Sequence, residues 1–319
     1  MTAIHRTDLL PTEMNAGKEA AVLDLLRAWR RAADAVAADQ WIRFFRDGGF
    51  RKNPSASQEV AAPGVAAAKT EVGAQRLQMV RYQVVGTLTS FISNRQNDFA
   101  EIVGRYEAFD DRTKHMLWVV NKAQAWFDRS RELIMSDTGE TIPEHIRELA
   151  RRIMKHVLKQ HRKPSFKRAN MVVDRRQATV ANAANATAFP LWLRLGTLDK
   201  GQRIEIPLRS YPYFENRKGQ RCQTVQINAG DDGALRVGVV TDVTEAFADV
   251  RAAYTPLRDT LSIDFGLATL IATDAGDLMG RDALRQLAKL DKRISTIARH
   301  RQKAGLKVRS PRYNRAVRQ

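Results

Sequence analysis

Asp264 is the residue of this sequence that is best placed to do chemistry, because it begins the segment Asp264-Phe265-Gly266. It lies within an apolar stretch, residues 261–266, which predicts a buried strand. A strand fixes the direction of a carboxylate, and a glycine two residues later lets a metal ion or a phosphate backbone come close. The pattern therefore predicts that Asp264 is a catalytic and metal-binding carboxylate.

An aspartate and a glycine at this spacing occur in several kinds of site, and four interpretations compete. A ribonuclease H-like nuclease of the RuvC type uses a first-strand aspartate with later carboxylates to hold two divalent metal ions. An actin-like ATPase turns a similar segment toward nucleotide phosphates, but the long α/β remainder of that fold is not found here. A protein kinase also has Asp-Phe-Gly, but no His-Arg-Asp or Gly-x-Gly-x-x-Gly loop precedes it. The fourth interpretation is structural: the aspartate caps a hairpin.

Positive charge is concentrated in two stretches of this 319-residue chain, whose net charge is +18. Residues 151–176 have ten Lys and Arg against one acid, and residues 281–319 have thirteen against two, so the remaining chain is nearly neutral. A generally basic surface would only aid solubility, whereas two dense clusters favour nucleic acid as a partner. The predicted nucleic-acid-binding residues are Lys163, Lys167, Arg168, Arg175, Arg176, Lys292, Arg293, Arg299, Arg301, Lys303, Lys307, Arg309 and Arg312.

Aromatic residues beside arginines form a further candidate. Tyr211, Tyr213 and Phe214 lie close in sequence to Arg209 and Arg217. Such rings stack on unpaired bases in many RNA-binding proteins, but they also pack on sheets at turns, and the two interpretations remain open.

The first half of the chain is predicted to be helical, because its apolar residues recur at steps of four and three. The first helix begins at an N-cap, Thr12 or Asn15, and runs to about Phe45. A short strand at 3–10 precedes it. Further helices are predicted around 77–91, 116–127 and 146–157, and a loop at 51–65. Four tryptophans in these apolar stripes are predicted to lie in the core: Trp29, Trp41, Trp118 and Trp126.

The apolar period changes to two near residue 190, which predicts an antiparallel β module with hairpins. Its strands are expected around 191–195, 204–208, 225–227 and 235–239. A final unit then has a strand at 261–266, a second at 270–273, a turn, and a basic helix from Arg281 that is interrupted at Ser310. The tail 306–319 is rich in arginine and poor in apolar residues, so we expect it to lack order without a partner.

Several segments, taken in their order along the chain, resemble TnpB-like (OrfB-type) transposon-encoded RNA-guided nucleases and type V CRISPR effectors. Residues 257–280, LRDTLSIDFGLATLIATDAGDLMG, are similar to the first RuvC motif of that family, and the basic segment after them is similar to its basic helix. His5 to Glu13 resembles the opening strand and helix start. KPSFKRANMVVD, WLRLGTLDKGQRIEIPLRS and LRVGVV resemble the strands of the wedge domain.

The resemblance implies an α+β protein with a first wedge strand (1–12), a helical recognition lobe (13–165), an antiparallel β wedge (166–256) and part of a ribonuclease H-like (RuvC) nuclease domain (257–319). It implies binding of a guide RNA and RNA-directed recognition of target DNA, with magnesium-dependent DNA endonuclease activity in the complete family member. The alternatives are a nuclease-dead guide-RNA- or DNA-binding regulator, and a transposition-associated DNA-binding protein without a guide.

The sequence departs from the family after Asp264. The second and third carboxylates of the family's catalytic set are not recognisable in the residues that follow. The zinc ribbon is not recognisable either, because Cys222 is the only cysteine. One carboxylate cannot hold two metal ions ~4 Å apart. We therefore expect the nuclease site, including its set of magnesium ligands, to be incomplete in this chain.

The sequence also bears on where in the cell the protein is expected. No apolar run approaches the ~20 residues of a membrane-spanning helix, and no secretion signal is recognisable. These features predict a bacterial cytoplasmic protein, associated with the nucleoid when bound to DNA, with no membrane contact and no obligate protein partner.

Overall fold

The protein is described from a computed structural model, which covers residues 3–55, 57, 62–183, 188–230, 233–255, 260–266, 269–306 and 310–317. Backbone contacts divide the chain into two compact units, Met1–Asp249 and Val250–Gln319, which are described separately. This division falls a few residues before the expected domain boundary at 256/257. Both units combine helices with antiparallel strands, so the chain is α+β, as predicted.

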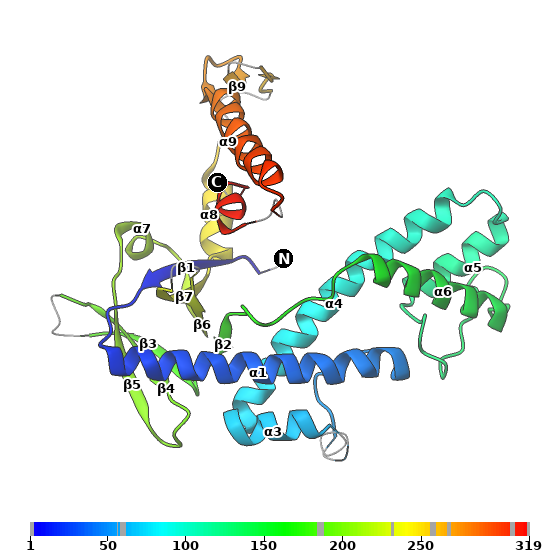
Figure 1. The fold of residues 1–319 in the computed structure, drawn as a ribbon, viewed down its shortest axis with the longest axis horizontal. Coiled ribbons are helices and arrows are strands. Elements are labelled where there is room, and N and C mark those ends of the chain that lie inside the picture. The colour runs from blue at the N-terminus through cyan, green and yellow to red at the C-terminus, as the bar shows by residue number, and fades with distance from the viewer. Residues whose placement is uncertain are drawn as a thin grey trace. The chain divides into compact units, whose positions relative to one another are not determined.

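Among the described residues, five helices make up most of the segment 16–160 of the first unit (Figure 1). The first is capped by Asn15, whose side chain accepts a hydrogen bond from the Lys18 backbone N–H, and it ends at Gly48. One helix begins at Pro63, inside the segment predicted to be a loop, because proline fits the first turn of a helix. The five helices are α1 (Ala16–Asp47), α3 (Pro63–Val72), α4 (Ala74–Arg105), α5 (Asp111–Lys122) and α6 (Glu144–Gln160).

The long helices α1 and α4 each contribute to two hydrophobic cores. One core combines α1, α3 and the first half of α4 with the strands of this unit. The other combines the end of α1 and the second half of α4 with α5 and α6. Trp29 and Trp126 are fully buried in these cores, and Trp41 is half-buried. The prediction for Trp118 is wrong: this side chain is 50% exposed, because Leu117 and Val120 take the inward face of α5.

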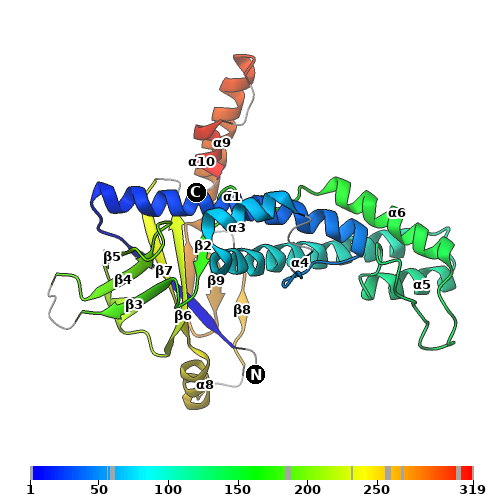
Figure 2. The ribbon, with the colours of Figure 1, turned by 90° about the horizontal axis from the view of Figure 1, so that it is seen from below.

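The strands of the first unit form two antiparallel sheets (Figure 2). The four-stranded sheet has the order β1-β7-β6-β2, and the three-stranded sheet has the order β3-β4-β5. The strands are β1 (His5–Pro11), β2 (Met171–Val173), β3 (Ala178–Asn182), β4 (Leu191–Gly196), β5 (Arg203–Leu208), β6 (Gln220–Ala229) and β7 (Leu235–Asp242). Two short helices, α7 (Pro212–Glu215) and α8 (Thr244–Ala253), follow β5 and β7.

The N-terminal strand belongs to the same sheet as the last strand of the unit. β1 pairs with β7 in antiparallel register, from His5 opposite Asp242 to Pro11 opposite Arg236. The helices α1 to α6 therefore form an insertion between two strands of one β module. A buried ion pair also fixes β1, because Asp8 accepts hydrogen bonds from Arg217 Nε at 2.5 Å and Nη2 at 2.8 Å.

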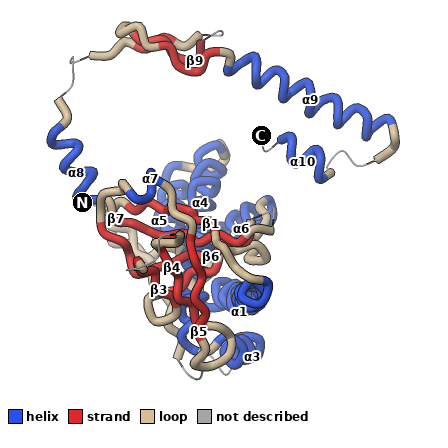
Figure 3. Tube along the Cα trace, turned by 90° about the vertical axis from the view of Figure 1, so that its left-hand side faces the viewer, coloured by secondary structure: helices blue, strands red, loops and turns tan. Residues whose placement is uncertain are grey.

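The second unit has a small antiparallel sheet of order β10-β9-β8. Figure 3 shows its strand β9 and the helices α9 and α10 that follow the sheet. Its elements are β8 (Ile263–Asp264), β9 (Thr269–Thr273), β10 (Leu278–Arg281), α9 (Ala283–Lys303) and α10 (Pro311–Val317). The hairpin partner of the Asp264 strand is the one predicted. The strand is not buried, however, because Ile263 is 51% exposed and Phe265 is also exposed. Among the described residues of this unit, only Ala316 is buried.

Part of the tail that we expected to lack order forms α10. Ser310 caps this helix, since its Oγ accepts a hydrogen bond from the Tyr313 N–H at 3.1 Å and its carbonyl accepts one from Asn314. Helix α10 contacts α9, and its Ala316 is buried. The composition of the tail did not indicate this contact.

Candidate nucleic-acid interface

The segment between α6 and β2 presents three of the predicted phosphate-binding residues. Phe166 is buried in the core and anchors the segment, while Lys163, Lys167 and Arg168 around it are exposed. The Lys163 ammonium lies 5.6 Å from the centre of the Trp41 ring. We call this segment, residues 163–168, the basic linker. It is a rigidly anchored group of cations, which suits contacts to a phosphate backbone.

A fourth cation reinforces the basic linker. Arg30 of α1 donates from Nε to the carbonyl of Ala169 at 3.1 Å. Its pKa is lowered, first by burial and then by the positive charge of Arg168. Like charges held close together raise the local positive potential and favour an anion beside them.

Arg175 and Arg176 have different roles although they are adjacent. Arg176 donates to Asp174 Oδ2 from Nη2 at 2.6 Å, so its charge is compensated within the protein. Burial acts to raise the pKa of Asp174, but hydrogen bonds from Arg176 and Gln75 outweigh this effect and lower it. Arg175 is exposed and lines a pocket of about 180 Å³ together with Arg221. Arg175 is therefore the better candidate for a phosphate contact.

A second basic site in the first unit was not predicted from the sequence. It is a pocket of about 490 Å³ between the end of α1, the segment after α5 and one face of α6. Arg151 is fixed there, because its Nε donates to the carbonyl of Trp126 at 3.2 Å. The four-residue step from Arg151 to Lys155 on α6 was the signal available in the sequence. The pocket is lined by Phe45, Arg46, Phe127, Arg129, Arg151 and Lys155.

The second unit presents a basic face along α9. Lys292, Arg299 and Lys303 follow each other at steps of seven and four, which places them on one side of the helix. Arg299 and Lys303 line a pocket of about 180 Å³ together with Thr296 and His300. Arg293 and Arg301 lie on other sides of α9. Arg312 lies in α10, and Lys307 and Arg309 lie outside the described residues.

Asp264 does not lie in a metal site within the described part of the chain. It is exposed on β8, opposite Ala272 of β9. No group of three or more His, Cys, Asp or Glu among the described residues is arranged to hold a metal ion. The described residues therefore do not fit a pair of magnesium ions.

The local structure also explains why residue 266 is a glycine. Its N–H donates to the carbonyl of Thr269 at 3.2 Å, and a Cβ at this position would lie 2.9 Å from the same oxygen. The space that we expected for a metal or a phosphate is thus occupied by the Thr269 carbonyl.

The aromatic residues near Arg217 are divided between packing and exposure. Phe214 is buried in the core, and the Tyr211 hydroxyl donates to Asp8 Oδ1 at 3.1 Å. Burial, followed by the hydrogen bond to Asp8, raises the pKa of Tyr211. Tyr213 is exposed, with the Arg217 guanidinium 4.7 Å from its ring centre. Only Tyr213 is therefore placed to stack on a base.

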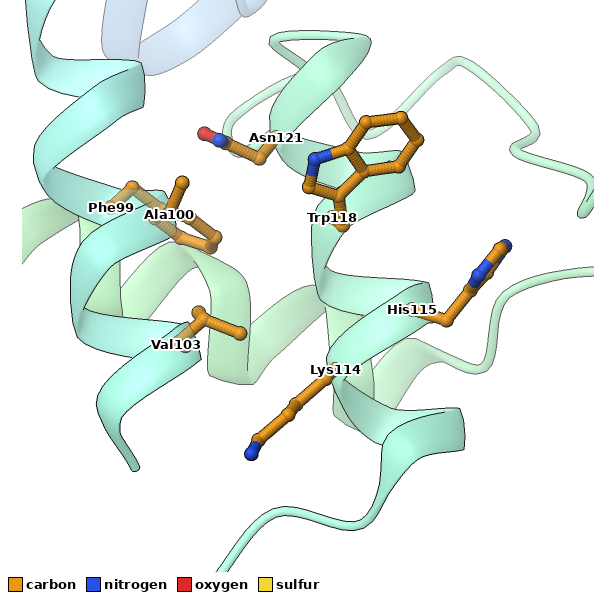
Figure 4. Close-up of a pocket in the computed structure, with 8 residues that line it drawn as sticks. Phe99, Ala100, Val103, Lys114, His115, Trp118 and Asn121 are labelled. Carbon is orange, nitrogen blue, oxygen red and sulfur yellow. The ribbon is translucent and has the colours of Figure 1, made fainter. Parts of the chain in front are cut away.

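An apolar slot of about 390 Å³ lies between α4 and α5 (Figure 4). Sequence reasoning missed it, because the exposed Trp118 was predicted to be in the core. The slot is lined by Phe99, Ala100, Val103, Gly104, Lys114, His115, Trp118 and Asn121.

No protein-family model matches this sequence, and no curated protein matches it significantly. Within the described residues, the helices are too short or too polar to cross a membrane.

Proposed function

We propose that this chain binds a guide RNA and is directed by it to DNA, in the manner of TnpB-like and type V CRISPR effector proteins. The observation that carries the proposal is the pairing of β1 with β7. It makes α1 to α6 an insertion in a β module, which is the order of parts that the sequence resemblance implies. The basic linker lies where the insertion returns to the sheet, between α6 and β2.

Exposed cations on well-anchored elements support a polyanionic partner. The basic linker, the 490 Å³ pocket and the basic face of α9 each bring several Lys and Arg side chains together at the surface. Binding by phosphate neutralisation releases counterions, so log K should fall with log salt by about 0.7–0.9 per contact. A flat salt titration of the binding constant would exclude this mode of binding.

The experiment that tests the guide is purification of the chain from its host, followed by sequencing of the nucleic acid that accompanies it. We expect RNA of one defined sequence that resists exchange with bulk RNA. Random RNA, or DNA alone, would instead support a DNA-binding protein that acts in transposition without a guide. Removal of RNA by ribonuclease before a DNA-binding assay provides the control.

We further propose that this chain does not cleave DNA by itself. Asp264 is exposed and has no carboxylate cluster around it within the described residues. This observation favours the second candidate function, a nuclease-dead regulator that binds guide RNA and DNA. A plasmid-nicking assay with protein, RNA and magnesium should show no turnover. Turnover that is lost in Asp264→Ala would contradict the proposal.

A further inference from the structure

The slot between α4 and α5 has the shape and the chemistry of a site for a flat ring. In Figure 4, Ala100 and Val103 of α4 face Trp118 of α5, while Lys114 and Asn121 lie at opposite ends. Its walls are mainly apolar, and its volume is about 390 Å³. In Figure 4 the Trp118 ring stands beside this space, with the edge that carries its nitrogen toward α4, so a planar group in the slot can contact the ring.

Trp118 is held in place although half of its side chain is exposed to water. The ammonium of Lys122 lies 5.0 Å from the ring centre, and the His115 ring is 6.4 Å from it. An exposed tryptophan forgoes the free energy that burial would give it. A ring that is exposed and yet positioned by a cation is prepared to stack on a ligand.

Asn121 brings a polar atom without a described partner, its Oδ1, to one end of the slot. Its Nδ2 donates to the carbonyl of Gln96 at 3.0 Å, which fixes the orientation of the amide. Its Oδ1 is buried and accepts no hydrogen bond from the described residues. An apolar occupant would leave this oxygen unpaired, whereas a heterocycle with an exocyclic amine can donate to it. The side chains that screen the oxygen must shift as the ring enters.

The charges near the slot favour an anionic ligand. Lys114 lines one end, and Lys122 lies over the Trp118 ring. His115 faces Asp137, with 3.9 Å between Nε2 and Oδ2, so it is directed to that carboxylate. Two lysines beside an aromatic ring suit a nucleotide, because its base can stack while its phosphates meet the ammonium groups.

We propose that this slot takes one unpaired nucleobase of a single-stranded nucleic acid. The base stacks on Trp118, its exocyclic amine faces Asn121, and its phosphates lie near Lys114 and Lys122. The proposal rests on the proposed function, since it requires a nucleic-acid partner. It adds a site that reads whether a base is unpaired, whereas the basic surfaces bind phosphate without regard to pairing.

The test uses the full chain with short single-stranded RNA and DNA of one sequence and with the matching duplex. Binding of a single strand should quench tryptophan emission in the wild type, and the part of this quenching that is due to Trp118 should be lost in Trp118→Phe. Trp118→Ala should weaken single-strand binding about 5- to 150-fold, the range for loss of one stacking contact, and leave duplex binding unchanged. Tyr82→Ala is the matched control, because Tyr82 is also an exposed aromatic residue but lies on α4 outside the slot, so this change should have no effect. The RNA and DNA strands show which of the two supplies the base.

Two outcomes separate the site from the function. If Trp118→Ala binds single strands as tightly as the wild type, while wild-type binding remains salt-dependent, the slot is not a base site and the proposed function stands. If the wild type binds no nucleic acid at low salt, both proposals fail.

A comparison of two pyrimidines tests the role of Asn121. Cytosine homopolymers should bind more tightly than uracil homopolymers, because cytosine has an exocyclic amine and uracil does not. Equal affinity would show that Asn121 does not contact the base. Trp118→Phe, which keeps a ring, guards against a folding defect in Trp118→Ala.

Discussion

The two units contain antiparallel sheets that look alike in sequence and differ in burial. In the four-stranded sheet of the first unit, Ile227 of β6 is 1% exposed and Val237 of β7 is also buried. In the sheet of the second unit, Ile263 is 51% exposed and Leu270 is also exposed. The same apolar strand residues therefore have different environments, because the first sheet shares a core with α1 and α4.

This difference indicates where the free energy of folding resides. Burial of apolar surface contributes roughly 25 cal/mol per Å², so a sheet with exposed apolar side chains contributes little. A small sheet without a packed face is marginal in water. The first unit should therefore fold cooperatively, and the second should depend on whatever it contacts. The proposed RNA would be one such contact.

The largest expected effect is on hydrogen exchange. Amides of β7 should exchange only through global unfolding, with a free energy of about 5–15 kcal/mol, whereas amides of β9 should exchange through local opening at a small fraction of that value. Mass spectrometry of the full chain after deuterium labelling would measure both. Equal protection of β7 and β9 would show that the second unit folds as a finished domain.

The next effect separates the two sheets by the same substitution. Ile227→Ala should lower the free energy of unfolding by about 2–5 kcal/mol, because it leaves a cavity in the core. Ile263→Ala should change it by less than about 0.5 kcal/mol, because the side chain is largely in water already. Urea unfolding followed by tryptophan emission reports the first unit alone, since all five tryptophans precede residue 250.

A large effect of Ile263→Ala on that tryptophan signal would contradict the separation of the two units. It would mean that the β8 side chain stabilises the first unit. Far-ultraviolet circular dichroism, which reports both units, serves as the control in the same titration.

A smaller effect is expected when each unit loses three positive charges. Replacing Lys163, Lys167 and Arg168 by alanine should reduce the slope of log K against log salt by about 2–3, if each contacts one phosphate. The matched change on α9 replaces Lys292, Arg299 and Lys303. Arg176→Ala is the control in the first unit, because Arg176 is already paired with Asp174. A loss of slope in only one triple variant would identify the unit that carries the nucleic acid.

Sequence patterns predicted most of the helices and strands, but they predicted less well which side chains are buried and which are exposed. The N-cap at Asn15 and the strands around β4 to β7 follow from local residue types and alternation, which need no knowledge of the fold. The outward position of Trp118 could not be predicted, because an apolar stripe does not reveal which neighbours cover it. The 490 Å³ pocket escaped notice because its cations come from separate segments.

The candidate chemistry was predicted less well than the elements. Asp264 was found by its motif, but whether a strand is buried depends on layers that the motif does not contain. The RuvC-like fold and the guide RNA remain predictions that rest on the resemblance. The order of parts could be anticipated because it needs only the sequence of elements, whereas a metal site needs several carboxylates to converge in space.

The smallest expected effect concerns acid stability and belongs to the first unit alone. Asp128 accepts hydrogen bonds from Ser130 Oγ at 2.7 Å and from the backbone N–H of Ser130 and Arg131. The hydrogen bond from the Ser130 side chain, followed by those from the backbone, lowers the pKa of Asp128 against the opposing effect of burial. The turn also packs on Gly48, where a Cβ would lie 2.5 Å from that of Asp128.

Because the pKa of Asp128 in the folded state is below the unfolded value of about 3.9, the charged carboxylate stabilises the fold above that pH. This contribution is lost as the pH falls through the folded pKa. Asp128→Ala should therefore cost about 0.5–2 kcal/mol at pH 7, as for loss of a capping group, and less at pH ~2. Asp128→Asn keeps an acceptor but cannot titrate, so it should cost less at pH 7. Urea unfolding by tryptophan emission at both pH values measures the difference, and a deficit of Asp128→Ala that stays constant with pH would show that the carboxylate charge does not stabilise this turn.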